Sequence, residues 1–246
     1  MSGAHPSTVL WRAHKNVGPY PAGVVPVPDQ IRGTSFFPGG TGLWMPGARE
    51  LPALPVGGVM VLGHDFHNEA GYEWSKKHEA ENLNSPTWRN LRSFLDAVDI
   101  PKEHCFFTNV YMGLRRGEET TGRFPGAKYP EFVTRCREFF LLQVSTQRPA
   151  LILAMGKYVP LFLGPLSSQL SPWTAKSSFK QRDAAGHSII DNVTFVGASI
   201  SPCVIVSIVH PCFRLQNVWR RRWKDDTGEG AERAMVKEAM RMAGLS

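Results

Sequence analysis

Residues 57–68 read Gly57-Gly58-Val59-Met60-Val61-Leu62-Gly63-His64-Asp65-Phe66-His67-Asn68. The four apolar residues from Val59 to Leu62 lie between glycines, which is typical of a strand buried on both faces inside a parallel sheet. Groups that handle protons or ions follow at once: His64, Asp65 and His67. Ligands of open α/β sheets bind beyond the carboxyl ends of the strands, so this position indicates an active site. The alternative is a simple strand–helix turn, in which Gly63 permits the bend and Asp65 caps the next helix.

The pattern after this stretch alternates between strands and helices. We expect strands over residues 105–110, 150–155 and 203–209, and a hairpin that joins 188–191 to 194–198. Helical spacing predicts helices over 85–98, 130–146 and 230–243, and a short helix after Gly156-Lys157. Residues 113–128 and 164–188 are expected to be irregular. This succession predicts an α/β fold, a three-layer sandwich with a central, mainly four-stranded parallel sheet flanked by helices.

The first 56 residues differ from the rest of the chain. Nine of the 19 prolines fall there, and helix-period patterning is absent. Five aromatic residues, Trp11, Tyr20, Phe36, Phe37 and Trp44, are too many for a free tail. We therefore expect residues 1–56 to form a Pro/Gly-rich arm packed on an α/β domain of residues 57–246.

The charge balance favours a polyanionic partner. The chain has a formal net charge of +7 and a pI near 9.4, which favours nucleic acid although many basic proteins bind none. No apolar run reaches the roughly 18 residues of a membrane span. The start of the chain also lacks the apolar core of a signal peptide, so we expect a cytoplasmic protein. Four scattered cysteines without a C-x-x-C pair, Cys105, Cys136, Cys203 and Cys212, argue against a zinc or iron–sulfur site.

Polar residues recur at the ends of the expected strands. Asp65, Asn109, Gly156 and His210 each follow a strand, and the carboxyl ends of parallel strands share one edge, so these residues should approach one another. Each has a structural alternative: Asn109 can close a turn, and His210 can be a core histidine. No G-x-S-x-G elbow, Walker A loop or G-x-G-x-x-G motif is present, which argues against acyl transfer and nucleotide hydrolysis. Together, the carboxylate, amide and imidazole indicate a catalytic site.

These motifs resemble those of the uracil-DNA glycosylase superfamily. In that superfamily one strand ends in a Gly-x-Asp-Pro-Tyr-like motif, here Gly63-His64-Asp65-Phe66-His67. A second strand ends in an asparagine, here in Phe107-Thr108-Asn109-Val110. A His-Pro-Ser-like motif follows late in the chain, here His210-Pro211-Cys212, and Leu151–Gly156 looks like the third strand of the family. The resemblance covers about residues 57–215 and leaves the arm unexplained.

The resemblance implies roles for individual residues. Asp65 would orient the attacking water and stabilise the cationic sugar. Asn109 would pair with the polar edge of the extruded base, and His210 would donate a hydrogen bond to a base oxygen. Tyr72 or Trp74 would stack on the base, unless both are packing residues. Backbone amides after Gly156, next to Lys157, would hold a phosphate. The motif residues His64, Phe66 and His67 would line the base pocket.

Three residues depart from the superfamily pattern. Phe66 replaces the usual proline, Cys212 replaces a serine, and His67 replaces the tyrosine that crowds carbon 5 of the pyrimidine and rejects thymine. The smaller, polar His67 opens the pocket to a 5-substituent and can bond a hydroxyl on it. We therefore expect uracil or a 5-modified pyrimidine as the substrate, with a bulky modified cytosine of phage DNA as one case. Repair and antiviral defence are both compatible with this expectation.

A basic tract after His210 supports a DNA partner. Its members are Arg214, Arg220, Arg221, Arg222 and Lys224, with Trp219 and Trp223 interleaved. Such residues would contact phosphates, and Phe213 or Leu215 would be the wedge that fills the gap left by the flipped base. Arg115, Arg116 and Arg123 lie in the loop after Asn109, on the same expected edge. The alternative is a solvated cationic face.

The sequence therefore predicts a monomeric, monofunctional DNA glycosylase that needs no cofactor and no metal. No lysine is placed next to Asp65 to form a Schiff base, so lyase activity is not expected. Two alternatives stay open. One is a metal-dependent hydrolase that uses His64, Asp65, His67 and His210, all suitable ligands for zinc or iron. The other is a DNA-binding module with the same fold and no catalytic activity.

Overall fold

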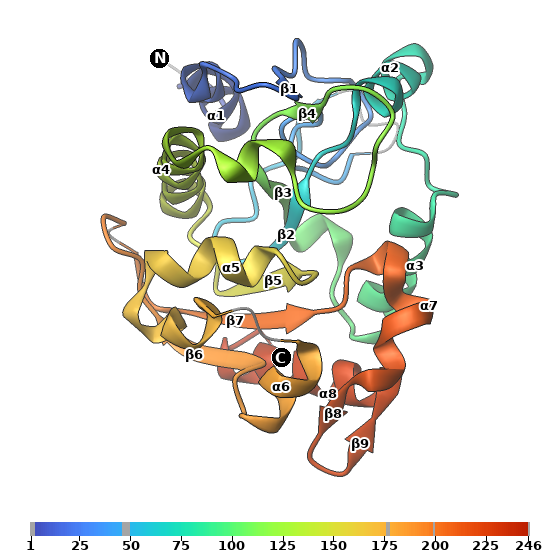
Figure 1. Cartoon of the computed structure of the whole chain (residues 1–246), viewed down its shortest axis with the longest axis vertical. Coiled ribbons are helices and arrows are strands. Elements are labelled where there is room, and N and C mark those ends of the chain that lie inside the picture. The colour runs from blue at the N-terminus through green and yellow to red at the C-terminus, as the bar shows by residue number, and fades with distance from the viewer. Residues whose placement is uncertain (1–2, 46–49, 176–177, 199, 246) are drawn as a thin grey trace.

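The structure is a computed structural model and describes residues 3–45, 50–175, 178–198 and 200–245. Its centre is a five-stranded sheet in the order β3-β2-β5-β7-β6 (Figure 1). Four strands run parallel: β2 (Val59–Asp65), β3 (Cys105–Tyr111), β5 (Leu151–Met155) and β7 (Cys203–Ile208). The fold is therefore mixed α/β with a mostly parallel central sheet, which confirms the predicted class and its four parallel strands.

The fifth strand, β6 (Ile189–Val193), runs antiparallel to β7 at one edge of the sheet. The predicted hairpin is therefore wrong, because residues 194–198 form no strand and β6 pairs with β7 instead. Phe195 is nevertheless 3% exposed and packs in the core. Phe195, which was assigned to a strand because it is apolar, thus lies in a loop and packs into the core from there.

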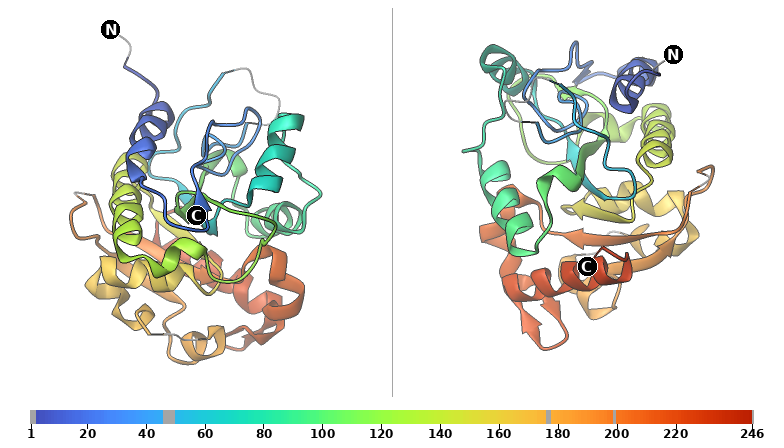
Figure 2. Two further views of the ribbon diagram at one scale, coloured as in Figure 1. Left: turned by 45° about the horizontal axis from the view of Figure 1, so that its top comes forward. Right: turned by 180° about the vertical axis from the view of Figure 1, so that it is seen from behind.

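Alternate side chains of β2 contact two separate cores, because successive residues of a strand point to opposite faces. Met60 and Leu62 contact one cluster, which includes the apolar residues of α4 (Pro130–Gln147). Val59 and Val61 contact the other, which includes those of α3 (Pro86–Ala97) and α8 (Gly228–Met242). Figure 2 shows these helices around the sheet from two further sides. Burial on both faces explains why the strand is apolar at every position from Val59 to Leu62.

Helices α3, α4 and α8 form close to their predicted bounds, and the Ser85 hydroxyl accepts a hydrogen bond from Trp88 N at 3.4 Å as an N-cap. The helix α2 (Glu69–His78) was not predicted, because only Tyr72 of its residues is buried and no apolar periodicity results. Its N-cap is Asn68, whose side chain accepts from Gly71 N at 2.9 Å. Asp65 is therefore not the helix cap that the alternative reading of residues 57–68 required.

The remaining elements are short. They are α5 (Val159–Leu163), α6 (Phe179–Ala184) and α7 (Arg214–Asn217), and two strand pairs, β1 (Val24–Val25) with β4 (Leu114–Arg115) and β8 (Arg222–Trp223) with β9 (Asp226–Thr227). Short 3-10 helices span Lys15–Val17, Lys102–His104, Pro125–Lys128, Gly164–Leu166, Ser168–Trp173, Pro211–Phe213 and Val218–Arg220. Within the described ranges, no helix combines the length and the hydropathy that crossing a bilayer requires.

The N-terminal residues lie along the edge strand β3. Phe37 N donates to Phe107 O at 3.0 Å, and Phe107 N donates to Gly42 O at 2.8 Å. The helix α1 (Pro6–His14) contradicts the expectation that this segment lacks helices. Proline is tolerated in the first turn of a helix, so Pro6 does not prevent it. Leu10 of α1 is fully buried in the cluster that α4 covers.

Candidate active site

A cleft of about 1790 Å³ opens at the carboxyl ends of β2, β3, β5 and β7. The four residues expected at these strand ends, Asp65, Asn109, Gly156 and His210, all line it. The strand register explains part of this arrangement, since Gly63 lies opposite Asn109 and Asp65 lies opposite Tyr111. A carboxylate, an amide and an imidazole thus face one space.

The carboxylate of Asp65 is held by two neighbours. Arg115 Nε donates to Oδ1 at 3.0 Å and Arg115 Nη2 donates to Oδ2 at 2.9 Å, a bidentate pair. His64 Nδ1 lies 2.8 Å from Oδ2. Burial acts to raise the pKa of Asp65, but the hydrogen bonds and charges of His64 and Arg115 outweigh burial and lower that pKa. Asp65 is therefore an anion at neutral pH.

The prediction of Arg115 as a phosphate contact is wrong. Its side chain is 2% exposed, and beyond Asp65 its guanidinium donates to the carbonyls of Thr121 and Gly122, each at 2.9 Å. Donors that are occupied inside the protein do not reach a phosphate. The neighbouring Arg116 and Arg123 are exposed, but neither lines the cleft.

His210 follows β7 and presents a neutral imidazole. Cys212 N donates to its Nδ1 at 3.4 Å, and Cys212 Sγ lies 3.0 Å from the same nitrogen. Burial raises the pKa of the Cys212 thiol to about 11, so the thiol keeps its proton. Burial also lowers the pKa of His210 to about 4, although the negative charge of Asp65 acts to raise that pKa. With Nδ1 as an acceptor, the proton of the neutral ring is on Nε2, which makes His210 a hydrogen-bond donor.

Gly156 makes room for His210 at the end of β5. Its φ is +88°, and a Cβ at this position would lie 3.2 Å from His210 Cβ. Its own N–H donates to Ile208 O at 2.8 Å, so the Gly156 amide is used within the sheet. The amides after Gly156, to which the phosphate contact was assigned, stay a prediction. Lys157 is exposed and lines the cleft, with Nζ 4.8 Å from the centroid of the Tyr158 ring. The lysine, rather than the glycine amide, can contact an anion here.

Asn109 is buried and oriented by the N-terminal segment. Its Nδ2 donates to Phe37 O at 2.9 Å, and since a carbonyl only accepts, this contact fixes which way the amide faces. A Cβ on Gly63 would lie 2.3 Å from Asn109 Oδ1, so only glycine fits opposite the amide. The amide keeps one N–H and its oxygen for a ligand. No pattern in the sequence indicates the contact between Asn109 and Phe37 O.

The other three residues of the first motif form part of the cleft wall. The ring of His64 stacks on Tyr158 with centroids 4.8 Å apart. Phe66 packs on the N-terminal segment, where a Cβ on Gly39 would lie 2.1 Å from the Phe66 ring. His67 is exposed and lies on Gly71 of α2, with its Nδ1 2.8 Å from Asn68 N. The His67 ring therefore has a supported position at the mouth of the cleft.

The prediction of Tyr72 as a base-stacking residue is wrong. Tyr72 is 1% exposed, does not line the cleft, and donates its hydroxyl proton to Asp29 O at 3.1 Å. Trp74 is 41% exposed and lines the cleft, stacked on His78 at 4.1 Å. Four further aromatic residues line the cleft that the sequence reasoning missed: Phe36, Trp88, Tyr158 and Phe179. They come from segments with no recognisable motif, so only the folded chain identifies them.

Glu81 is a second carboxylate in the cleft wall that the sequence reasoning missed. It accepts hydrogen bonds from Ser35 N and from Trp88 Nε1, the latter at 2.6 Å. Burial raises the pKa of Glu81 to about 7, although these hydrogen bonds act to lower it. Glu81 therefore ties the N-terminal segment to α3 at the side of the cleft.

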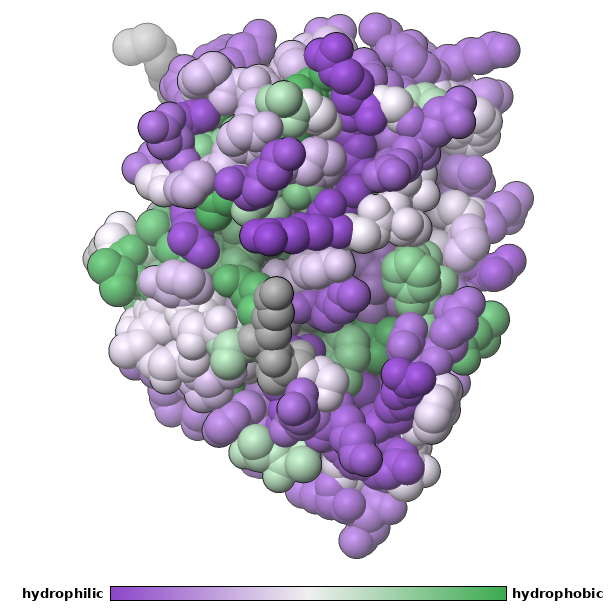
Figure 3. All heavy atoms as spheres, viewed as in Figure 1, coloured by the Kyte–Doolittle hydropathy of each residue, from purple (hydrophilic) through white to green (hydrophobic). Residues whose placement is uncertain are grey.

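The basic tract divides into buried and exposed arginines. Arg214 and Arg221 are 6% and 0% exposed and form ion pairs inside the protein, so their predicted contact with phosphate is wrong. Arg220 and Arg222 are exposed and line the cleft. Phe213 and Leu215 are 42% and 79% exposed on the same segment. Figure 3 shows a mostly hydrophilic face with hydrophobic residues exposed at the level of α7.

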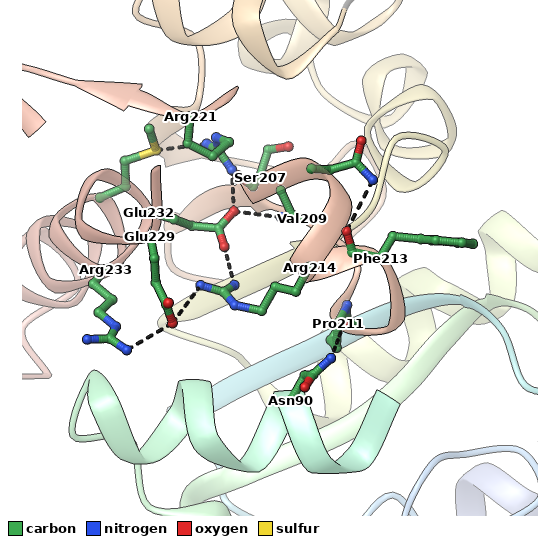
Figure 4. A network of polar contacts seen from close by, with 12 residues as sticks. Asn90, Ser207, Val209, Pro211, Phe213, Arg214, Arg221, Glu229, Glu232 and Arg233 are labelled. Carbon is green, nitrogen blue, oxygen red and sulfur yellow. Dashed lines mark hydrogen bonds and ion pairs between the residues drawn. The ribbon is translucent and has the colours of Figure 1, made fainter. Parts of the chain in front are cut away.

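A buried network holds the segment that carries these residues (Figure 4). Glu232 of α8 is 0% exposed, accepts from Val209 N at 2.7 Å, and pairs with Arg214 and Arg221. Asp183 of α6 completes the network, with Oδ1 3.0 Å from Arg221 Nη2. Because Val209 precedes His210, one glutamate fixes both the end of β7 and the segment after it.

In the described part of the chain, no group of three or more His, Cys, Asp or Glu side chains is arranged to hold a metal ion. His64 and Asp65 are in contact, but Arg115 occupies both carboxylate oxygens.

A comparison with models of known protein families gives no match. A comparison with curated protein sequences gives no match either. Function is therefore inferred from the site itself.

Proposed function

We propose that the protein is a DNA glycosylase that flips a base out of DNA and hydrolyses its N-glycosidic bond, leaving an abasic site. The observation that carries the proposal is that Asp65, Asn109 and His210, from three strand ends, line one cleft. The order of these residues along the chain resembles that of the uracil-DNA glycosylase superfamily. The placement of α4 against one core and of α3 and α8 against the other supports the three-layer arrangement proposed with it.

In this proposal Asp65 stabilises the sugar cation that forms as the bond between C1′ and the base breaks. The electron pair of that bond leaves with the base, and a water oxygen then bonds to C1′. A buried anion stabilises a developing positive charge strongly because few water molecules screen it. The bidentate contact with Arg115 keeps the carboxylate in one orientation.

His210 acts on the departing base. As the bond breaks, negative charge develops on the base, and a donor aimed at a base oxygen stabilises it. The neutral imidazole has its proton on Nε2, as its contacts with Cys212 indicate. Asn109, with one N–H and its oxygen unused, pairs with the polar edge of the base.

The proposed substrate class is uracil or a 5-modified pyrimidine. The cleft, about 1790 Å³, is larger than the space that a single base needs, and typical ligand pockets are about 300 to 1,000 Å³. His67 and Trp74 at its mouth offer an imidazole and an exposed indole to a substituent. Lys157, Arg220 and Arg222 supply positive charge for phosphates, and Phe213 or Leu215 is the proposed wedge.

The test is base release from DNA. Duplexes and single strands that carry uracil, a thymine mismatch, hydroxymethylcytosine or glucosylated cytosine are incubated with the protein, and released bases are identified by mass spectrometry. Abasic sites are detected by cleavage in alkali. Asp65→Asn should lower the rate at least about 10³-fold while DNA affinity is kept. Full activity of Asp65→Asn would remove Asp65 from the mechanism.

The variant His67→Tyr tests the substrate class. If His67 admits a 5-substituent, this variant should lose release of the modified base and keep release of uracil. Release of uracil alone, unchanged in His67→Tyr, would contradict the 5-modified substrate. Salt-sensitive DNA binding without any base release would instead indicate a silent DNA-binding module, and activity that EDTA removes and zinc restores would indicate a metal-dependent hydrolase.

A further inference from the structure

Arg115 uses its whole guanidinium inside the protein. Nε and Nη2 donate to the two oxygens of Asp65, at 3.0 Å and 2.9 Å. Nη2 also donates to Gly122 O, and Nη1 to Thr121 O, both at 2.9 Å, with Arg123 O at 3.5 Å from Nη1. Since a guanidinium has five N–H donors, none is left for a substrate.

The backbone of Arg115 is fixed as well. Its N–H donates to His67 O at 2.9 Å, and its strand β4 pairs with β1 through Val24. The guanidinium carbon lies 5.6 Å from the centroid of the Phe124 ring. The cation therefore approaches Asp65 from a rigid position and not from a mobile loop side chain.

This arrangement limits what Asp65 can accept. A carboxylate offers about four lone-pair sites. Arg115 occupies one site on each oxygen, and His64 Nδ1, 2.8 Å from Oδ2, occupies a third. One site on Oδ1 remains. Asp65 can thus orient a single water molecule, and its negative charge is held against protonation by a buried cation.

We propose that Arg115 is a positioning residue of the glycosylase reaction, which fixes Asp65 as an oriented anion that acts on the sugar cation by its charge. The inference rests on the proposed function and deepens it. In this scheme Asp65 does not become protonated: the attacking water bonds to C1′ and releases its proton to solvent, and the base leaves with the electron pair of the broken bond. The competing view is that Arg115 only ties residues 121–123 to β2.

The pH dependence of the single-turnover rate separates the two views. The wild-type rate should stay within about twofold between pH 8 and pH 5, because Asp65 remains ionised over this range. Besides His64 and Arg115, the titratable groups that face Asp65 are His210 and Tyr111, with pKa values of about 4 and about 12, and both stay neutral over this range. In Arg115→Met, burial of Asp65 is no longer opposed by the guanidinium, and the rate should fall about tenfold for each pH unit below the new pKa. Arg115→Lys keeps a positive charge without the bidentate contact and should give an intermediate profile.

Arg135→Met is the matched control. Arg135 of α4 also ties a loop through backbone carbonyls, with Nε 2.8 Å from Val17 O and Nη2 2.7 Å from Pro19 O, but it has no contact with Asp65. Its loss should lower stability and leave the pH profile unchanged. A folded Arg115→Met or Arg115→Lys variant with the wild-type pH profile would overturn the proposal.

A second measurement needs neither substrate nor activity. The Asp65 carboxyl carbon is titrated by NMR in the wild type and in Arg115→Lys, which is the variant more certain to fold. A titration midpoint that moves upward by at least one pH unit supports the proposal, and an unmoved midpoint overturns it. Should the wild-type protein release no base, the proposed function fails, while this titration still decides what Arg115 does to Asp65.

Discussion

His210 combines a partly buried imidazole with neighbours that fix its tautomer. Burial lowers its pKa to about 4, and Cys212 directs an N–H and a thiol toward Nδ1. The ring is therefore neutral across the physiological range, with its remaining proton on Nε2. A neutral donor stabilises a leaving base without first having to gain a proton from solvent.

His210→Gln should lower the single-turnover rate about 10²-fold, because one preorganised donor to the developing negative charge is removed. Since His210 titrates near pH 4, the wild-type rate should have no inflection near pH 6.5 that the variant lacks. The measurement is the rate of base release from pH 5 to pH 8 for both proteins. Cys212→Ser, which keeps a donor to Nδ1, is the control and should stay close to the wild type. An inflection near pH 6.5 that vanishes in His210→Gln would show that the charged imidazole is the active form.

Single residues were predictable from sequence where a strand end placed them. Asp65, Asn109 and His210 follow apolar runs, and parallel pairing brings such positions to one edge. Arg115 and Arg221 were misread, because a basic side chain in a sequence shows its charge and not its partner. Asp65 lies 50 residues from Arg115 and Glu232 lies 11 from Arg221, and only the folded chain brings each pair together.

At the scale of elements, α8 connects to the end of β7 through buried charges. Glu232 accepts from Val209 N and pairs with Arg214 and Arg221, both nearly inaccessible to solvent. A buried ion pair need not stabilise a protein relative to apolar residues, but removing one partner leaves the other charge without compensation. The network therefore commits α7 and the end of β7 to one arrangement.

Glu232→Gln should lower the free energy of unfolding by about 3 to 5 kcal/mol, since two buried arginines lose their shared carboxylate. Urea denaturation followed by circular dichroism measures the change. Glu229→Gln is the comparison: Glu229 is on the same helix and lies 3.6 Å from Arg214 Nη2, but its side chain is 49% exposed, so its loss should cost no more than about 1 kcal/mol. Equal losses of the free energy of unfolding in the two variants would mean that the buried carboxylate contributes no more to stability than the exposed one.

Elements were predictable where burial is one-sided or complete. The four parallel strands and the helices α3, α4 and α8 carry the apolar periodicity that burial produces. The helix α2 has a single buried residue, and of the three buried residues of α1, Ser7, Leu10 and His14, only Leu10 is aliphatic, so neither helix shows that periodicity. The predicted hairpin was wrong because β6 pairs with β7 and not with residues 194–198. No local sequence pattern distinguishes these two pairings.

At the scale of the whole molecule, two histidines make the fold sensitive to acid. Burial lowers the pKa of both His14 and His210 to about 4 from 6.5. Between pH 6.5 and pH 4, these two histidines therefore bind protons in the unfolded chain but not in the folded protein. The stability that these groups contribute is fully present above pH 6.5 and is lost as the pH falls toward 4. Glu81, with its pKa raised to about 7, acts in the opposite direction, since its contribution is lost as the pH rises through 7.

His14→Phe isolates one part of this effect. His14 stacks on Trp11 and contacts Phe139 edge to face, in an apolar setting where phenylalanine fits. Between pH 7.5 and pH 4.5 the variant should lose roughly 2 kcal/mol less free energy of unfolding than the wild type. Urea titrations at the two pH values measure the difference. An identical loss in both proteins would show that His14 takes up no proton on unfolding.

The hydrogen bonds between residues 37–42 and β3 have a consequence for how the chain is made. Strand β3 is an edge of the sheet, and the N-terminal segment occupies the backbone groups of Phe107 there. An uncovered edge strand invites pairing with another molecule, which is a route to aggregation. The ribosome releases the protective segment first and the strand it protects roughly seventy residues later. Residues 37–42 therefore remain unpaired until β3 has been synthesised. A chain without residues 37–42 would fold with an unpaired edge strand that other copies of the protein can pair with.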